Sequence, residues 1–340
     1  MIPSFRMIEP SLDLVKAKIV GNARAESEFV SNLAEYALKV RGQMLRPSLL
    51  LTCSLLGGAA EPSAGAVSLA AMVELIHGAS LLHDDVVDGG RFRRKFATVN
   101  AKWGNKEAVL LGDFVLALAL DILSDFPDSR VLKSAQRITR TLAMGELIEL
   151  QHASDVNLTE AQYLEIIGFK TASFFGECCY LGGVMAGLES GPLEALQRAG
   201  TSVGIAYQIC DDLLDVQGSF SGLGKDITAD VLNGNITLPI IRTLTMDTPG
   251  ATQLRAAIAA ADGTWVRANL PQLVRDSGGA EHARALAREY AATASAAIES
   301  LPAACPRPIV RALSGFPEYM FARVETGGDA EAAAARVAHQ

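Results

Sequence analysis

The sequence LLHDDVVD at residues Leu81–Asp88 decides how this chain folds and what it does. A second Asp-Asp-x-x-Asp triplet lies far downstream in YQICDDLLD at Tyr207–Asp215, again after an apolar run. Side chains four residues apart share one helix face, so the first and last aspartate of each triplet point the same way. Gly89 and Gly218 follow the triplets, which predicts that both triplets stand at helix C-terminal ends.

Three adjacent carboxylates at a helix C-terminus are unfavourable unless a cation neutralises them, because the helix dipole is negative there. Carboxylate clusters suit hard cations, and Mg²⁺ binds through a few carboxylates together with waters and phosphate oxygens. One triplet alone is equally well explained as a solvated acidic helix end, but two triplets near basic residues favour a metal and diphosphate site. The predicted metal ligands are Asp84, Asp85, Asp88, Asp211, Asp212 and Asp215.

The composition limits the class of protein. The chain has 340 residues, of which 49% are hydrophobic and 20% charged, so it can bury a large core. Its net charge of −8 argues against nucleic acid as a partner. The five cysteines have no metal-ligand spacing, and no secretory signal opens the sequence, so we expect buried thiols and a cytoplasmic protein.

Helical periodicity recurs along the chain, and sustained alternation of the kind that predicts strands is absent. The expected helices cover 11–40, 48–56, 66–87, 105–124, 129–152, 160–167, 193–216 and an Ala-rich region at 250–325. The most apolar long run, 108–126, contains two aspartates and predicts a buried helix, so no transmembrane segment is expected. The fold class is all-α, a single-domain helical bundle around a deep central cavity over residues 1–326, with a frayed polar tail at 327–340.

Basic residues accompany both triplets. The loop after the first carries four cations, Arg91, Arg93, Arg94 and Lys95, which are well placed to grip phosphates. Lys170 lies in an apolar stretch and calls for an anionic partner, the alternative being that it snorkels to solvent. The long loop at 218–234 contains Lys225 and is typical of a lid or binding loop.

With both triplets in view, the chain resembles the trans-isoprenyl (polyprenyl) diphosphate synthases from about residue 8 to residue 325. The matching pieces are Glu74–His77, the first triplet, Arg93-Arg94, Gly112-Asp113, Lys170-Thr171, Tyr207-Gln208 with the second triplet, and Gly224-Lys225 through to Thr237-Leu238-Pro239. The resemblance implies an isoprenoid-synthase-type bundle, usually a homodimer, in which the triplets face each other across a deep pocket. It also implies Mg²⁺ as cofactor, three ions in each site, with Mn²⁺ as a substitute.

The resemblance further implies a role for each matched residue. The catalytic residues are Asp84, Asp85, Asp88, Lys170, Asp211, Asp212 and Lys225, and the six triplet aspartates hold the metal. The residues that bind the allylic diphosphate are Arg93, Lys170, Gln208 and Lys225, with Thr171 beside them. Isopentenyl diphosphate is held by Arg46, His77 and Arg94, next to Gln43. The implied reaction joins the two substrates head to tail into a longer trans-polyprenyl diphosphate.

Two departures from the family pattern leave other functions open. The family's Gly-Gly-Lys-Arg-x-Arg-Pro loop reads RGQMLRP here, so two cations are replaced by Gln43 and Met44, and Asn235 replaces a lysine before Thr-Leu-Pro. A class I terpene cyclase or an atypical prenyl-coupling enzyme would tolerate this loss, although Arg46, His77 and Arg94 remain. A regulatory subunit of a heteromeric synthase is a further alternative, which the complete triplets oppose.

Product length is predicted from the helix that carries the first triplet. Residues one and two turns before Asp84 are expected to line the tunnel below the metals, and they are Val73, Ile76, Ala79 and Ser80. Ala79 and Ser80 are small, so we expect a product of C25 or longer. A floor near Leu116–Leu120 would limit it.

Overall fold

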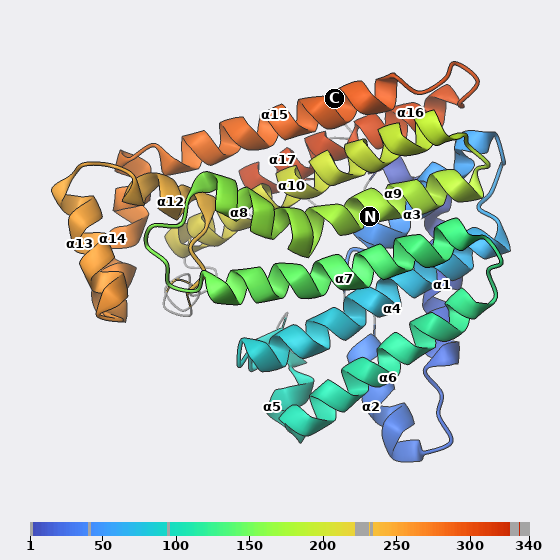
Figure 1. Ribbon diagram of the computed structural model, residues 1–340, viewed down its shortest axis with the longest axis horizontal. Coiled ribbons are helices and arrows are strands. Elements are labelled where there is room, and N and C mark those ends of the chain that lie inside the picture. Colours follow the sequence, from blue (N-terminus) through green and yellow to red (C-terminus); the bar gives the residue numbers. More distant parts are fainter. Residues whose placement is uncertain are drawn as a thin grey trace.

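The computed structural model describes residues 3–39, 42–93, 96–221, 231, 234–326 and 333, and it is all-α as expected (Figure 1). The predicted tail at 327–340 lies outside these residues except for Ala333. The helices of the first half are η1 Pro3–Ile8, α1 Glu9–Asn22, α2 Glu28–Leu38, α3 Leu45–Cys53, η2 Ser54–Gly57, α4 Ala64–Val87, α5 Val99–Trp103, α6 Asn105–Ser124 and α7 Ser129–Gln151. Those of the second half are α8 Glu160–Ile167, the π-helical turn η3 Gly168–Ala172, α9 Ser173–Met185, α10 Ser190–Ser221, α12 Leu238–Leu244, α13 Pro249–Ala259, α14 Gly263–Asp276, α15 Gly279–Glu299, α16 Arg307–Ser314 and α17 Phe316–Glu325.

Helix α4 is the central helix of the bundle and ends at the first triplet. The Ser63 hydroxyl caps its start by accepting a hydrogen bond from the backbone N–H of Ala66 at 3.1 Å. The helix packs against α1, α3 and α6, so apolar residues on most of its surface are buried. Asp88 is its C-terminal cap, which confirms that the first triplet stands at a helix end.

The prediction that the second triplet also ends a helix is wrong. Helix α10 continues through Asp215 and Gly218 to Ser221. A glycine inside a helix costs only about 1 kcal/mol relative to alanine, so packing of α10 against α9, α15 and α17 overrides the expected stop. The second triplet therefore projects from the side of a continuous helix.

Two further differences concern the N-terminal third. The helix expected over 11–40 is two helices, because the Ser31 hydroxyl binds the backbone N–H and C=O of Ala25 at 2.9 and 3.0 Å and stabilises a break before α2. The expectation of no strand also fails at one point, where β1 Phe92–Arg93 pairs antiparallel with β2 Phe96–Ala97. This short hairpin directly follows the first triplet, and Tyr36 of α2 holds it by donating a hydrogen bond to the C=O of Ala97 at 2.8 Å.

One described helix meets the length and composition criteria for crossing a membrane, and it is α4 and not the helix over the 108–126 run. Its most apolar window is 61% buried in the bundle. The central helix of a compact all-α domain meets the same criteria, so this helix is accounted for by the core.

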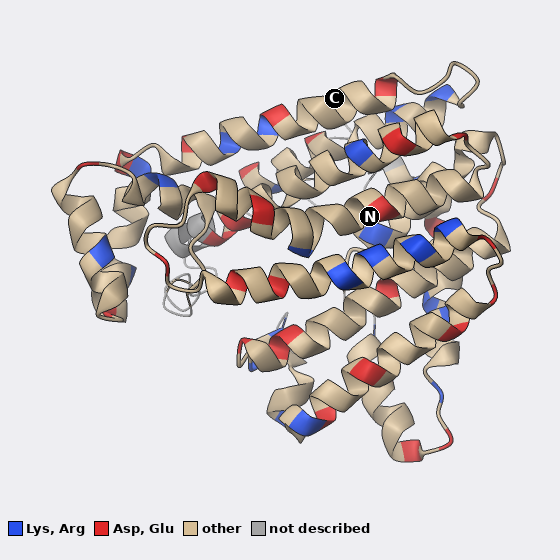
Figure 2. Ribbon diagram, in the orientation of Figure 1, with Lys and Arg blue, Asp and Glu red and all other residues tan. Residues whose placement is uncertain are grey.

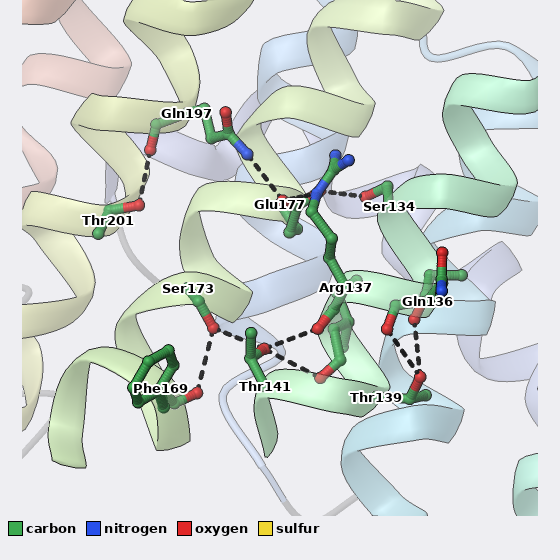
Figure 3. A network of polar contacts seen from close by, with 12 residues as sticks. Ser134, Gln136, Arg137, Thr139, Thr141, Phe169, Ser173, Glu177, Gln197 and Thr201 are labelled. Atoms are coloured by element: carbon green, nitrogen blue, oxygen red, sulfur yellow. Dashed lines mark hydrogen bonds and ion pairs between the residues drawn. The ribbon is translucent and has the colours of Figure 1, made fainter. Parts of the chain in front are cut away.

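A buried polar network fixes three helices around the centre (Figure 3). The Glu177 carboxylate of α9 accepts hydrogen bonds from Ser134 and Arg137 of α7 and from Gln197 of α10, at 2.5 to 2.8 Å. One turn earlier, the Ser173 hydroxyl donates to Thr141 of α7 at 2.9 Å and lies 3.1 Å from the C=O of Phe169. A buried carboxylate with this many donors is fully satisfied, so the network holds the turn η3 in register with α7.

Candidate active site

A cavity of about 1020 Å³ opens among α3, α4, α7, α8, η3, α10 and α17. Figure 2 shows that acidic residues at the C-terminal ends of α4 and α7 gather at one end of the bundle. Most of the predicted site residues line this cavity: Gln43, Arg46, His77, Asp85, Asp88, Arg93, Lys170, Thr171, Gln208, Asp211, Asp212 and Asp215. Both triplets therefore contribute to one cavity, although Asp84 is not among the lining residues, and Arg46, Arg93 and Lys170 lie in its walls.

The first triplet is tied to the hairpin that follows it. Arg93 donates to one Asp85 carboxylate oxygen from Nε at 3.0 Å and from Nη2 at 2.8 Å. Asn100 donates to the Asp85 carbonyl at 2.8 Å and the Gly90 carbonyl at 3.0 Å, which fixes the chain between helix and hairpin. Burial raises the pKa of Asp85, and Arg93 opposes this. The predicted diphosphate ligand Arg93 is thus paired with a carboxylate in this structure.

One carboxyl group of each triplet has a pKa near 7. Burial raises the pKa of Asp84 to about 7, with Glu146 adding to the effect and Lys170 opposing it. Burial likewise raises the pKa of Asp212 to about 7, although Tyr163 and Gln208 donate hydrogen bonds to it at 2.6 and 2.9 Å. A buried carboxylate of this kind gains most from a bound cation, which stabilises the charged form.

Lys170 finds the anionic partners that its apolar surroundings called for. The turn η3 presents its ammonium to Glu146 at 2.8 Å and to Glu149, both on α7. Burial would lower the pKa of Lys170, but Glu149 and Glu146 outweigh it and raise the pKa, so the lysine is charged. The structure thus places a protonated lysine at the cavity wall, one residue before Thr171.

A hydrogen-bonded chain links η3 to the second triplet. The Thr171 hydroxyl donates to Gln208 Oε1 at 2.9 Å, and Gln208 Nε2 donates to Asp212 Oδ1 at 2.9 Å. Tyr163 of α8 completes the chain by donating to the other oxygen of Asp212. Asp212 is 7% exposed, so this chain sets its rotamer from both sides.

Two of the residues predicted for isopentenyl diphosphate, Arg46 and His77, line the same cavity. Arg46 Nη1 lies 3.3 Å from His77 Nε2, and the guanidinium carbon lies 4.8 and 4.9 Å from the ring centres of Phe174 and Phe175. Gln43 donates to the Tyr319 hydroxyl at 3.2 Å. The pKa of Arg46 is lowered by burial, which means that its charge is poorly solvated and favours an anionic partner.

Several predictions are not settled by this geometry. Arg94 and Lys225 lie outside the described residues. Val73, Ile76 and Ala79 are packed in the core, and Ser80 donates to the His77 carbonyl at 2.9 Å. None of these four α4 residues lines the cavity. Their proposed role in product length stays a prediction.

Metal binding also stays a prediction. In the described part of the chain, no three acidic, histidine or cysteine side chains come close enough to form a ready-made metal site. The donor set nevertheless fits Mg²⁺, because the triplet side chains supply only carboxylate oxygens and leave room for water and phosphate ligands.

Sequence reasoning missed four residues that shape the site: Glu146, Glu149, Tyr163 and Arg323. The two glutamates are three residues apart and close to the end of α7, so their common helix face was a usable signal. Tyr163 follows a capping box at Thr159 but carries no local sign of its long-range bond to Asp212. Arg323 lines the cavity from the last described helix, and only the tertiary fold brings it there.

Comparisons with known proteins agree with this site. The sequence model of the polyprenyl synthetase family matches residues 27–272. The chain is 33% identical to the octaprenyl diphosphate synthase of Escherichia coli (strain K12), over 85% of this chain and 89% of that protein.

Two solved structures are similar over nearly the whole fold. One is a polyprenyl synthase from Caulobacter crescentus CB15 in complex with calcium and isoprenyl diphosphate, with a TM-score of 0.84, 33% identity and coverage of 93% of this chain and 96% of that one. The other is a decaprenyl diphosphate synthase from Rhodobacter capsulatus, with a TM-score of 0.85, 31% identity and coverage of 95% and 99%. The chain therefore belongs to the polyprenyl synthetase family and is a prenyltransferase of the polyprenyl diphosphate synthase type.

Proposed function

We propose that this prenyltransferase joins isopentenyl diphosphate to an allylic diphosphate and repeats the step to a trans product of C25 or longer. One observation carries the proposal: five of the six triplet aspartates, all but Asp84, line the same cavity as the cations Arg46, Arg93 and Lys170. Acidic groups that hold a metal and basic groups that hold phosphate oxygens are what a diphosphate leaving group needs. The named relatives include octaprenyl and nonaprenyl diphosphate synthases, which supports a long product.

In this proposal the six triplet aspartates hold Mg²⁺, three ions in each site. When bound, the metal supplies Lewis-acid stabilisation of the departing diphosphate. Lys170 and Arg93 donate to the phosphate oxygens on which negative charge grows, and both are charged donors at the cavity wall. Gln208 keeps Asp212 oriented through its hydrogen bond, while Thr171 holds Gln208.

The allylic cation left behind must meet an alkene before it meets water. Apolar side chains supply a dry section of the cavity wall, among them Leu158, Ile166, Ile167 and Ile240. Ile166 and Ile167 of α8 and Ile240 of α12 lie near Lys170 and the second triplet, since α8 contacts η3 and α10, and α12 contacts α8 and α10. A reactive carbocation is protected by this exclusion of water.

The decisive experiment incubates the purified protein with Mg²⁺, isopentenyl diphosphate and allylic primers from C5 to C20, and determines the products by mass. The proposal expects polyprenyl diphosphates of C25 or longer. Hydrocarbons or alcohols of the primer's own length would instead establish the cyclase alternative, which Gln43, Met44 and Asn235 favour because they remove charge from the second substrate's side.

We also propose that the enzyme is a homodimer and that α6 and α7 form its interface. Leu110 of α6 and Leu132, Leu147 and Leu150 of α7 each expose between 53% and 67% of their surface. Exposed leucines in such numbers on two helices mark an association surface, and a second copy of the chain offers the same apolar face in return. Analytical ultracentrifugation of the wild type and of Leu147→Lys tests this. We expect a dimeric wild type and a weakened dimer in the variant, and the proposal is refuted if both proteins sediment as monomers.

The five cysteines are all free and buried, as predicted. Thiols kept in this state fit a reducing compartment, so we place the enzyme in the cytoplasm. Subcellular fractionation, followed by detection of the protein in each fraction, tests the assignment.

A further inference from the structure

Within the described part of the chain, two arginines in the cavity wall each carry a buried Nε–H without a hydrogen-bond acceptor: Arg46 of α3 and Arg323 of α17. The guanidinium of Arg46 contacts His77 through Nη1 and packs over the rings of Phe174 and Phe175. For Arg323, no acceptor for Nε is found in the described residues. More than 90% of buried polar groups in proteins are satisfied, so a buried guanidinium Nε–H that has no protein acceptor and faces a cavity indicates that the cavity binds an anion.

The position of Arg323 is set by the helix that carries it. Tyr319 lies one turn earlier on α17, so the two side chains share a helix face. Tyr319 is 3% exposed and accepts the hydrogen bond from Gln43, which ties the loop before α3 to α17. Helix α17 also packs along α10, the helix of the second triplet (Figure 1). Arg323 therefore stands where the loop, α10 and α17 meet.

This is the part of the site where charge is missing. Positions 43 and 44 carry cations in the family pattern, but here Gln43 is neutral and its side-chain amide donates a hydrogen bond to the Tyr319 hydroxyl. Met44 is 5% exposed, and its thioether side chain has neither charge nor a hydrogen-bond donor to offer to a diphosphate. A diphosphate bound beside Arg46 would lack two of its usual partners unless another element provided a cation.

We propose that Arg323 is that cation: it binds the diphosphate of isopentenyl diphosphate together with Arg46, in place of the cation absent at position 43. A guanidinium suits the task, because its planar fork donates two hydrogen bonds to one phosphate. The inference rests on the proposed function, since it assigns a residue to the second substrate of the elongation reaction.

The test is steady-state kinetics of Arg323→Gln with each substrate varied separately. The KM for isopentenyl diphosphate rises about tenfold or more, because a charged hydrogen bond to phosphate is lost, while the KM for the allylic diphosphate stays within about twofold. Arg323→Lys retains part of the affinity, since the charge remains. The matched control is Arg311→Gln, which removes an exposed arginine of α16 and leaves both KM values unchanged. Thermal unfolding of each variant shows that the fold is intact.

A double variant tests whether Arg323 replaces the cation that the family carries at position 43. Gln43→Lys introduced into the Arg323→Gln protein restores the cation at its family position, and we expect it to recover most of the lost affinity for isopentenyl diphosphate. The inference is overturned if Arg323→Gln raises both KM values equally, or if it changes neither.

The outcome is separable from that of the proposed function. Wild-type protein that makes no elongated product refutes the proposed function. In that case, calorimetric titration of wild type and Arg323→Gln with inorganic pyrophosphate, without divalent metal, still decides whether Arg323 binds a diphosphate. Equal affinities in the two proteins would overturn the anion site as well.

Discussion

Gly145 of α7 touches the turn that presents Lys170, and replacing it by alanine should move the lysine. A Cβ at position 145 would lie 2.6 Å from the backbone nitrogen of Lys170, 2.7 Å from its Cα and 2.9 Å from its Cβ. Ordinary contacts begin at 3.4 Å, so α7 and η3 must separate by about 0.8 Å. A displacement of this size at a substrate-positioning residue costs about 10²-fold in rate. We expect Gly145→Ala to lower kcat by about 30-fold to 100-fold.

The net loss of stability should be about 0–2 kcal/mol. Overpacking costs about 1–3 kcal/mol, and the better helix propensity of alanine returns about 1 kcal/mol. The assay is kcat from product formation at saturating substrates, with chemical unfolding of the same preparations. Gly168→Ala is the matched control, because a Cβ there meets nothing within 4 Å although the residue belongs to the same turn. If Gly145→Ala keeps kcat within about twofold of wild type, the contact does not position Lys170.

Three further outcomes follow from the site. The folded pKa of Asp84 and Asp212 is about 7, above the unfolded value of about 3.9, so the metal-free protein loses stability as pH rises from about 4 to about 7. The increase in Tm on addition of Mg²⁺ should therefore become larger between about pH 6 and pH 8, and an increase that does not vary with pH would contradict this. Tyr163→Phe removes a donor from Asp212, so we expect a loss of about 1–3 kcal/mol in unfolding free energy and a requirement for higher pH in Mg²⁺ binding, with Tyr290→Phe as the control on α15. Ser80→Phe fills space one turn before Asp84, and mass analysis should show shorter products; an unchanged product would remove this position from the tunnel.

Local signals predicted the helical architecture and most of the cavity wall. The apolar run before Asp84 and the serine cap at its start define α4, and the glycines after Asp88 end it. Thr159 predicts the start of α8 through its capping box. These features depend on residues within a few positions of one another, so a single sequence contains enough information to find them.

Features that depend on tertiary packing were not predictable in this way. Gly218 signals a stop, but α10 continues because its flanks are held by α9, α15 and α17. The partners of Lys170 lie on α7, 21 and 24 residues before it, and Tyr163 reaches Asp212 across 49 residues. Only the folded chain reveals these pairs, since nothing in the local sequence links their members.

The ion pairs around the cavity have a consequence for the order in which ligands can enter. Arg93 is neutralised by Asp85, and Lys170 by Glu146 and Glu149, before any substrate arrives. A lone metal ion must therefore compete with an arginine for its carboxylate, and a lone diphosphate must compete with carboxylates for its cations. Metal and diphosphate that enter together exchange partners with both pairs at once, so that no charge is stranded at any stage. We therefore expect a pocket with these ion pairs to bind the metal-complexed substrate in preference to either component alone.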